Sequence, residues 1–321
     1  MLELAPPRRG QGDWPHPALE LPEVPSRQAR GDAWGSAKTP VPPQPPVPVP
    51  DGVLHDNAPA RVAALDSAGV ALQLISPGPT IDACLRLPSD LAAGLLSAYN
   101  RYIVAHCRDH PDRLGAVLQL HGSEPRFSEQ EVAELRGEAS VRAVSLCLSV
   151  KISPDDRRFD PLWAALEQAG LPLLHRPSLC ARIWSPGRLL AYLRGAGVLQ
   201  KHPGLRIGFV AGDAERSEAE LTRPIAQHDD LRSRLFVAAT AAQLQRSAGA
   251  DDGAGAGNAT ALLWASDYPL KPDLPAELEL AQRALGPRSD DVLTASPRRF
   301  LDPDPYPGGG SSSESSTTGS V

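Results

Sequence analysis

Seven short apolar runs alternate with amphipathic stretches between residues 58 and 301, and this alternation constrains the fold more than any other feature of the sequence. The runs lie at residues 70–75, 114–120, 141–148, 171–175, 205–210, 235–239 and 261–265. Short apolar strands with helical crossovers predict a parallel sheet that is covered on both faces. A doubly wound sheet and a (β/α)8 barrel both fit this pattern.

Helices are predicted in the intervals between the apolar runs. The longest covers residues 88–109, where Leu91, Leu95 and Tyr99 recur on one side at a step of four. Residues 160–169 are amphipathic, and Gly170 is placed to cap that helix. The remaining helices are predicted near residues 59–67, 128–137, 186–199, 215–230, 240–247, 275–285 and 289–299.

Proline distinguishes the first part of the chain from the rest. Of the 34 prolines, a disproportionate share lies in residues 1–50, where the run PVPPQPPVPVP favours polyproline II and offers no core. We therefore predict a disordered leader at residues 1–52 and a body of barrel size at residues 53–302. Residues 303–321, rich in Gly, Ser and Thr, are predicted to form a flexible tail.

Charge and motifs argue against several classes of protein. The formal net charge is −6, without the basic stripe of a nucleic-acid binder. No apolar run is long enough to span a bilayer, and no secretory signal is evident at the N-terminus, so a cytoplasmic location is expected. GxGxxG, GxxxxGK[ST] and GxSxG are absent, which leaves dinucleotide binding, phosphate cradling and a nucleophile elbow unsupported.

Two strand ends carry side chains that could perform chemistry. In a parallel barrel, functional residues lie at the carboxyl ends of the strands. His175 ends one apolar run, and Asp267 follows another. A histidine and an aspartate at two strand ends could share a metal or a proton-transfer site. A hydrogen-bonded structural histidine and an aspartate that caps a turn remain open as alternatives.

Six segments, in order, resemble the amidohydrolase-related superfamily, in particular the branch that contains aminocarboxymuconate-semialdehyde decarboxylase. They are LDSAGV (65–70), YN with HPDRLG (99–100 and 110–115), FDPLW continuing to GLPLLH (159–175), HPGLR (202–206), ASDYP (265–269) and DVLTASPRRF (291–300). The resemblance covers about residues 58–301. It implies a distorted (β/α)8 barrel that holds one divalent metal, usually zinc.

The resemblance carries over only part of the metal site. It implies His175 and Asp267 as ligands, whereas the HxH pair of the family's first strand is absent and Ala211 stands where the family has a further histidine. We therefore predict a barrel that lacks or distorts its first strand and binds zinc weakly or not at all, because a catalytic zinc normally has three protein ligands. A chain whose true first strand was lost upstream is a further interpretation.

The resemblance implies a carboxy-lyase (decarboxylase) or hydrolase that acts on a small carboxylated or cyclic substrate; the alternative is a non-catalytic relative that binds a small molecule or a partner subunit. His175 and Asp267 are the catalytic candidates, with or without metal. Arg176 and Asn100 are candidates for binding a substrate carboxylate. We expect no nucleic-acid or membrane partner, and we predict a homodimer because a missing first strand leaves a sheet edge unpaired.

Overall fold

The computed structural model describes residues 57–77, 87–148, 152–176, 184–210, 221, 229–249, 261–269, 271 and 273–302. The chain separates into two units, Met1–Pro48 and Val49–Val321. All described residues belong to the second unit. The predicted leader and tail lie outside the described residues, as does Ala211.

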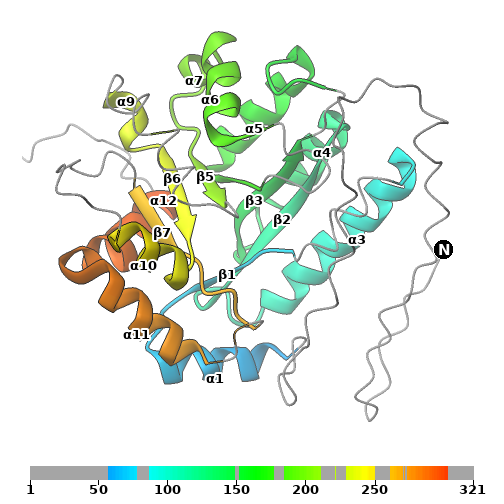
Figure 1. Ribbon diagram of the computed structural model, residues 1–321. Helices are drawn as coiled ribbons and strands as arrows, with labels where there is room; N and C mark the ends of the chain where they lie inside the picture. Colours follow the sequence, from blue (N-terminus) through cyan, green and yellow to red (C-terminus); the bar gives the residue numbers. More distant parts are fainter. Residues whose placement is uncertain are drawn as a thin grey trace, which may run out of the picture. The chain divides into compact units, whose positions relative to one another are not determined.

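Seven parallel strands form one sheet in which each strand pairs with the next strand along the chain (Figure 1). They are β1 (Gln73–Ile75), β2 (Leu114–Gly122), β3 (Val141–Leu148), β4 (Leu173–His175), β5 (Ile207–Val210), β6 (Leu235–Ala239) and β7 (Ala261–Trp264). A doubly wound sheet reverses its strand order at a switch point. The sequential order therefore excludes that alternative and shows the topology of a barrel. All seven predicted strands are confirmed.

Helices occupy the connections, as the sequence predicts. They are α1 (Ala58–Ala68), α3 (Ser89–Cys107), α4 (Pro125–Leu135), α5 (Asp160–Ala169), α6 (Pro186–Gly195), α7 (Val198–Lys201), α9 (Asp229–Arg232), α10 (Ala241–Gly249), α11 (Leu274–Leu285) and α12 (Ser296–Leu301), with the short turns η2 (Arg157–Phe159), η3 (Gly286–Arg288) and η4 (Asp291–Ala295). Most of the helix predicted at residues 215–230 lies outside the described residues. None of the described helices combines the length and the apolar character needed to cross a bilayer.

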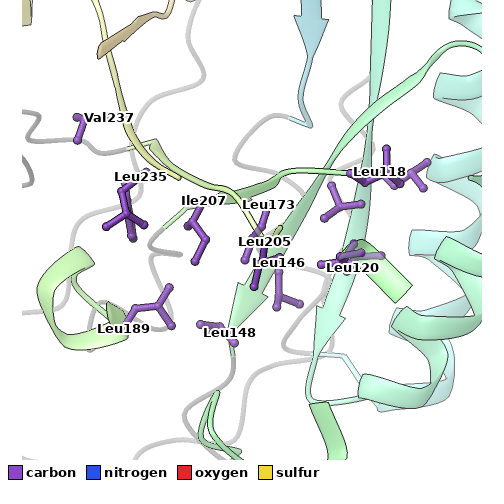
Figure 2. Close-up of a cluster of buried hydrophobic side chains, with 14 of the residues drawn as sticks. Leu118, Leu120, Leu146, Leu148, Leu173, Leu189, Leu205, Ile207, Leu235 and Val237 are labelled. Carbon is purple, nitrogen blue, oxygen red and sulfur yellow. The ribbon is translucent and has the colours of Figure 1, made fainter. Parts of the chain in front are cut away.

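Buried apolar side chains form a layer on each face of the sheet. The larger layer lies between the strands and the surrounding helices, where Leu146, Leu173 and Ile207 of the strands share a cluster with Leu189 of α6 (Figure 2). The smaller layer contains the alternate residues of the same strands. Its members are Val117, Ala143, Leu174, Phe236, Ala238, Leu263 and Phe300. Because side chains alternate along a strand, we name the two sides of the sheet the outer face and the inner face.

The last helix closes one end of the inner face. The Phe300 ring of α12 packs against Phe236 with ring centroids 5.1 Å apart, and a Cβ at Gly208 would lie only 3.1 Å from this ring. Arg206, which immediately precedes β5, donates to the Leu301 carbonyl at 3.3 Å. α12 therefore covers the amino ends of the strands. The carboxyl ends, where barrels place their functional groups, lie opposite.

The first and last strands of the described sheet do not pair with each other. At this gap α1 packs against α11. Arg61 of α1 donates from Nη1 to Gln73 Oε1 at 3.1 Å, and its guanidinium carbon lies 5.3 Å from the centroid of the Tyr268 ring. Within the described residues, the sheet therefore has seven strands and a gap that helices cover on the outer side. The homodimer expected from this edge stays a prediction.

Candidate functional site

Arg176 reaches across the carboxyl ends of the strands. It follows β4, and strand alternation places it on the same side as Leu174 of the inner layer. Its Nη1 donates to the carbonyl of Pro77, just beyond β1, although β2 and β3 separate the two strands. The Nε and Nη2 groups of Arg176 have no hydrogen-bond partner in the described part of the chain. A guanidinium with two donors in this arrangement matches the two oxygens of a carboxylate.

Asp267 lies beyond the carboxyl end of β7. Its backbone has a left-handed φ of 53°, a conformation that aspartate adopts more readily than most residues. Partial loss of hydration raises the pKa of its carboxyl above the ordinary value, while the positive charges of Lys271 and Arg176 oppose this rise. A carboxyl with a raised pKa is better suited to proton exchange near neutral pH.

His175 is the last residue of β4, and its ring lies on the outer face. Its strand neighbours, Leu146 and Phe209, both belong to the outer layer, and the Phe209 ring meets the imidazole edge-on at 5.9 Å. The His175 Nε2 lies 2.8 Å from the carbonyl oxygen of Trp184. Burial lowers the pKa of the imidazole to about 4, although the hydrogen bond to Trp184 opposes this effect. At pH 7 the ring is therefore neutral, with Nε2–H donating.

The structure does not bring His175 and Asp267 together. His175 is 1% exposed and lies under the Trp184 segment, whereas Asp267 is exposed and interacts electrostatically with Arg176. Burial and the Trp184 carbonyl account for the pKa shift of His175, with no contribution from Asp267. Asp267 is therefore under the electrostatic influence of Lys271 and Arg176, and not of His175.

Asn100, the second candidate for carboxylate binding, is fully buried in α3. Its Nδ2 donates to the Gln119 carbonyl at 3.1 Å and to Glu131 Oε2 at 2.8 Å, and its Oδ1 accepts from the Gln119 backbone N–H at 2.7 Å. The pairing of β1 with β2 extends only to Ala116. Asn100 therefore takes the place of β1 as the partner of β2, and both of its donors are used within the protein.

Two inner-face residues in the register row of Leu174, two residues before Arg176 along the strand direction, do not appear among the sequence candidates. Gln119 of β2 and Ser145 of β3 are buried direct neighbours across the two strands. The signal that could have found them is local, because Gln119 and Ser145 are polar interruptions in the strands LGAVLQLHG and VRAVSLCL. In a strand buried on both faces, a polar residue at an inner position indicates contact with something other than the apolar core.

The described residues do not fit the zinc centre that the family resemblance implies. Nowhere in the described ranges do three His, Cys, Asp or Glu side chains gather closely enough to hold a metal ion. His175 uses Nε2 for the Trp184 carbonyl, and its ring lies on the outer face. Of the two implied ligands, only Asp267 interacts with Arg176, which lies on the inner face. Two ligands separated in this way do not form the tetrahedral set that zinc requires.

Comparisons with known proteins give a likeness of structure only. No protein family matches the sequence, and no curated protein does. Among solved structures, 5-carboxyvanillate decarboxylase from Sphingomonas paucimobilis is 17% identical, with a TM-score of 0.53 over 75% of this chain and 82% of that one. The 2,6-dihydroxybenzoate decarboxylase from Rhizobium is 14% identical, with a TM-score of 0.56 over 75% and 87%.

An amidohydrolase from Staphylococcus aureus is 14% identical, with a TM-score of 0.55 over 76% of this chain and 90% of that one. A 5-carboxyvanillate decarboxylase from Novosphingobium aromaticivorans, 17% identical with a TM-score of 0.53 over 75% and 79%, is a complex with manganese. At such identities the likeness concerns the fold alone. The chain has the β/α-barrel fold of these decarboxylases and amidohydrolases, with seven parallel strands in its described part.

Proposed function

We propose that this chain binds a small carboxylated or cyclic molecule at the carboxyl ends of its strands and acts on it as a carboxy-lyase or hydrolase. The observation that carries the proposal is the Arg176 guanidinium, which crosses the strand ends with Nε and Nη2 free of partners in the described residues. In this proposal Arg176 holds the substrate carboxylate by two parallel hydrogen bonds. The names of the structural neighbours support the reaction class.

Asp267 is the proton-exchanging group of the proposed site. Its raised pKa keeps part of the carboxyl population protonated at a higher pH than an ordinary aspartate, and Arg176 acts on the same group by charge. A protonated carboxyl can deliver a proton to a carbon or to a leaving group, and its carboxylate form can take a proton from water. His175 has no part in these steps, because its ring is buried on the outer face.

The second candidate function is binding without catalysis. It is favoured by the separation of His175 from Asp267, since a single carboxyl without a partnering base or metal ligand is a minimal catalytic apparatus. This reading keeps Arg176 as the anchor of the ligand. It differs from the first in predicting that the ligand leaves unchanged.

The two candidates are separated by measuring binding and turnover on the same full-length variants. Calorimetry with a panel of small carboxylates should show binding that falls at least tenfold in Arg176→Ala and is largely retained in Asp267→Asn. For an enzyme, product formation by the wild type, followed as released CO2 or hydrolysed product, should be lost in Asp267→Asn. Binding without turnover in the wild type supports the second candidate. Equal binding by the wild type and Arg176→Ala contradicts both.

A further inference from the structure

Two buried polar side chains on the inner face have hydrogen-bonding atoms that the described chain does not use. Gln119 is 1% exposed and Ser145 is 0% exposed, and they are direct neighbours in the pairing of β2 with β3. Gln119 Oε1 and Ser145 Oγ have no partner in the described part of the protein. Burying a polar atom without a partner costs free energy. Two such atoms side by side indicate a group from outside the chain that completes them.

A buried serine of α4, bonded to the backbone near the end of β2, provides the contrast. Ser128, also 0% exposed, has its hydroxyl fully used: Oγ accepts from the His121 backbone N–H at 2.8 Å and donates to the His121 carbonyl at 3.1 Å. Among the described residues, Ser145 Oγ has no partner of either kind. A serine hydroxyl in this chain can therefore be buried with both partners, and the state of Ser145 is specific to its position.

The pair presents a defined set of hydrogen-bonding atoms. Gln119 Nε2 donates to the Leu120 carbonyl at 3.0 Å, which fixes the amide and leaves Oε1 as an open acceptor. Ser145 Oγ can both donate and accept. A ligand group with at least one hydrogen to donate satisfies Gln119, and a second hydrogen or a lone pair satisfies Ser145.

We propose that Gln119 and Ser145 form a second recognition point of the ligand site, which binds a neutral hydrogen-bond donor, a hydroxyl or an amide NH2, at the end of the ligand away from its carboxylate. This inference rests on the proposed function, in which Arg176 holds the carboxylate. Ser145 is the strand partner of Leu174 in β4, and Arg176 lies two residues further along the chain, just beyond the end of β4. The two recognition points are therefore about 7 Å apart along the strand direction.

The first test compares matched probes that differ only in the donor group. Calorimetry with the full-length protein measures the dissociation constants of pentanoate against 5-hydroxypentanoate and of benzoate against 4-hydroxybenzoate. The probe with the donor group should bind about tenfold more tightly to the wild type, as expected when one buried hydrogen-bonding site is completed. In Ser145→Ala and Gln119→Leu this advantage should disappear, so that the two members of each probe pair bind with about equal dissociation constants.

A second test uses the unliganded protein and does not depend on the choice of probe. Ser145→Ala removes a hydroxyl that has no partner, so its Tm should equal or exceed that of the wild type. Ser128→Ala, the matched control, removes a hydroxyl with two partners and should lower the Tm by several degrees. A Tm loss in Ser145→Ala as large as that in Ser128→Ala would show that Ser145 serves the fold, and it would overturn the inference.

The possible outcomes separate the inference from the proposed function. Equal binding of both members of each pair to the wild type, with loss of both in Arg176→Ala, overturns the inference and leaves the carboxylate site standing. A donor-group advantage in the wild type, together with an unchanged affinity of Arg176→Ala for the parent carboxylates, supports the inference and contradicts the role of Arg176. If no probe binds the wild type, both fail.

Discussion

At the scale of single residues, His175 is held neutral by its surroundings. Its ring is 1% exposed, packs edge-on against Phe209 and donates to the Trp184 carbonyl. Protonation would place a charge in an apolar layer with one carbonyl to stabilise it. Burial is therefore the main reason that the pKa lies near 4 rather than 6.5.

This burial predicts a pH dependence of stability. The unfolded chain takes up a proton on His175 as the pH falls through about 6.5, whereas the folded chain does so only near pH 4. The free energy of unfolding should therefore be insensitive to His175 above pH 7, fall between about pH 6.5 and 4, and level below that range, with a total loss on the order of 3 kcal/mol. His175→Gln keeps a donor for the Trp184 carbonyl and should remove this part of the slope in urea unfolding experiments.

His202→Gln is the control for that measurement. His202 is partly buried and bonds through Nδ1 to Glu167 Oε2 at 2.8 Å, so its replacement leaves the His175 contribution in place. Wild type and His175→Gln with the same slope between pH 6.5 and 4 would show that the ring is not protected from protonation in the folded state.

The sequence predicts where His175 lies but not which way it faces. The run Leu171 to His175 is apolar on both of its alternating sides, so no pattern of polar and apolar residues assigns the histidine to a face. Gln119 and Ser145 are the opposite case. Their polarity breaks an apolar strand at inner positions, and the signal is present in the sequence once the two strands are known.

At the scale of elements, helix boundaries could be predicted where a residue with a special backbone conformation marks them. α5 has the predicted bounds, because Gly170 adopts a left-handed φ of 64° and its N–H returns to the helix. The prediction near residues 186–199 misses the break between α6 and α7, where Gly197 has a φ of 72°. The start of α4 is also earlier than predicted, since Pro125 is suited to the first turn of a helix.

Asn100 of α3 is bonded to β2 beyond the point where β1 stops pairing with that strand. Removing the Asn100 side chain should destabilise the protein strongly. Asn100→Ala leaves the backbone N–H and carbonyl of Gln119 without their buried partner and removes one of the two donors to Glu131 Oε2, the other being Arg101. The expected loss in the free energy of unfolding is about 2–4 kcal/mol.

Denaturant titration measures this loss, with Arg108→Ala as the control. Arg108 lies beyond the end of the same helix, and within the described part of the chain its guanidinium makes a 3.9 Å surface ion pair with Glu138, which contributes less than about 1 kcal/mol. Losses of similar size in the two variants would contradict the role assigned to Asn100.

α12 stabilises the barrel through one aromatic side chain. Phe300 is 1% exposed and packs between Phe236 and Gly208 at the amino ends of the strands. Phe300→Ala should lower the free energy of unfolding by about 3–5 kcal/mol because it leaves a cavity on the inner face, and Phe300→Leu should cost clearly less. Chemical denaturation of both variants gives the comparison. Equal, small losses would mean that the helix closes the barrel without its aromatic ring.

At the scale of the whole barrel unit, the sequence limits the strand order to two topologies, a doubly wound sheet and a barrel. It does not predict how the described barrel closes. The alternation of strands and helices is a local pattern, whereas closure depends on contacts between residues far apart in the sequence. In the described sheet β1 and β7 do not pair with each other. Arg61 of α1 connects both sides of this gap, to Gln73 of β1 by a hydrogen bond and to Tyr268, beyond β7, by its position over the ring.

Because Arg61 contacts both sides of the gap, we predict that replacing it opens the gap and increases self-association. In β1 the N–H of Gln73 points to β2, so the N–H of Leu74 points toward the gap, because successive residues of a parallel strand bond to opposite sides. Arg61→Ala removes a hydrogen bond and a cation–π contact that span the gap and should cost about 1–2 kcal/mol. It should also speed the exchange of the Leu74 amide more than that of amides in β3.

An uncovered strand edge pairs readily with another chain, so light scattering should show more dimer in Arg61→Ala than in the wild type at equal concentration. Arg136→Ala, an exposed arginine at the end of α4, is the matched control. If Arg61→Ala and Arg136→Ala match the wild type in Leu74 exchange and in mass, the gap is closed by contacts other than those of Arg61.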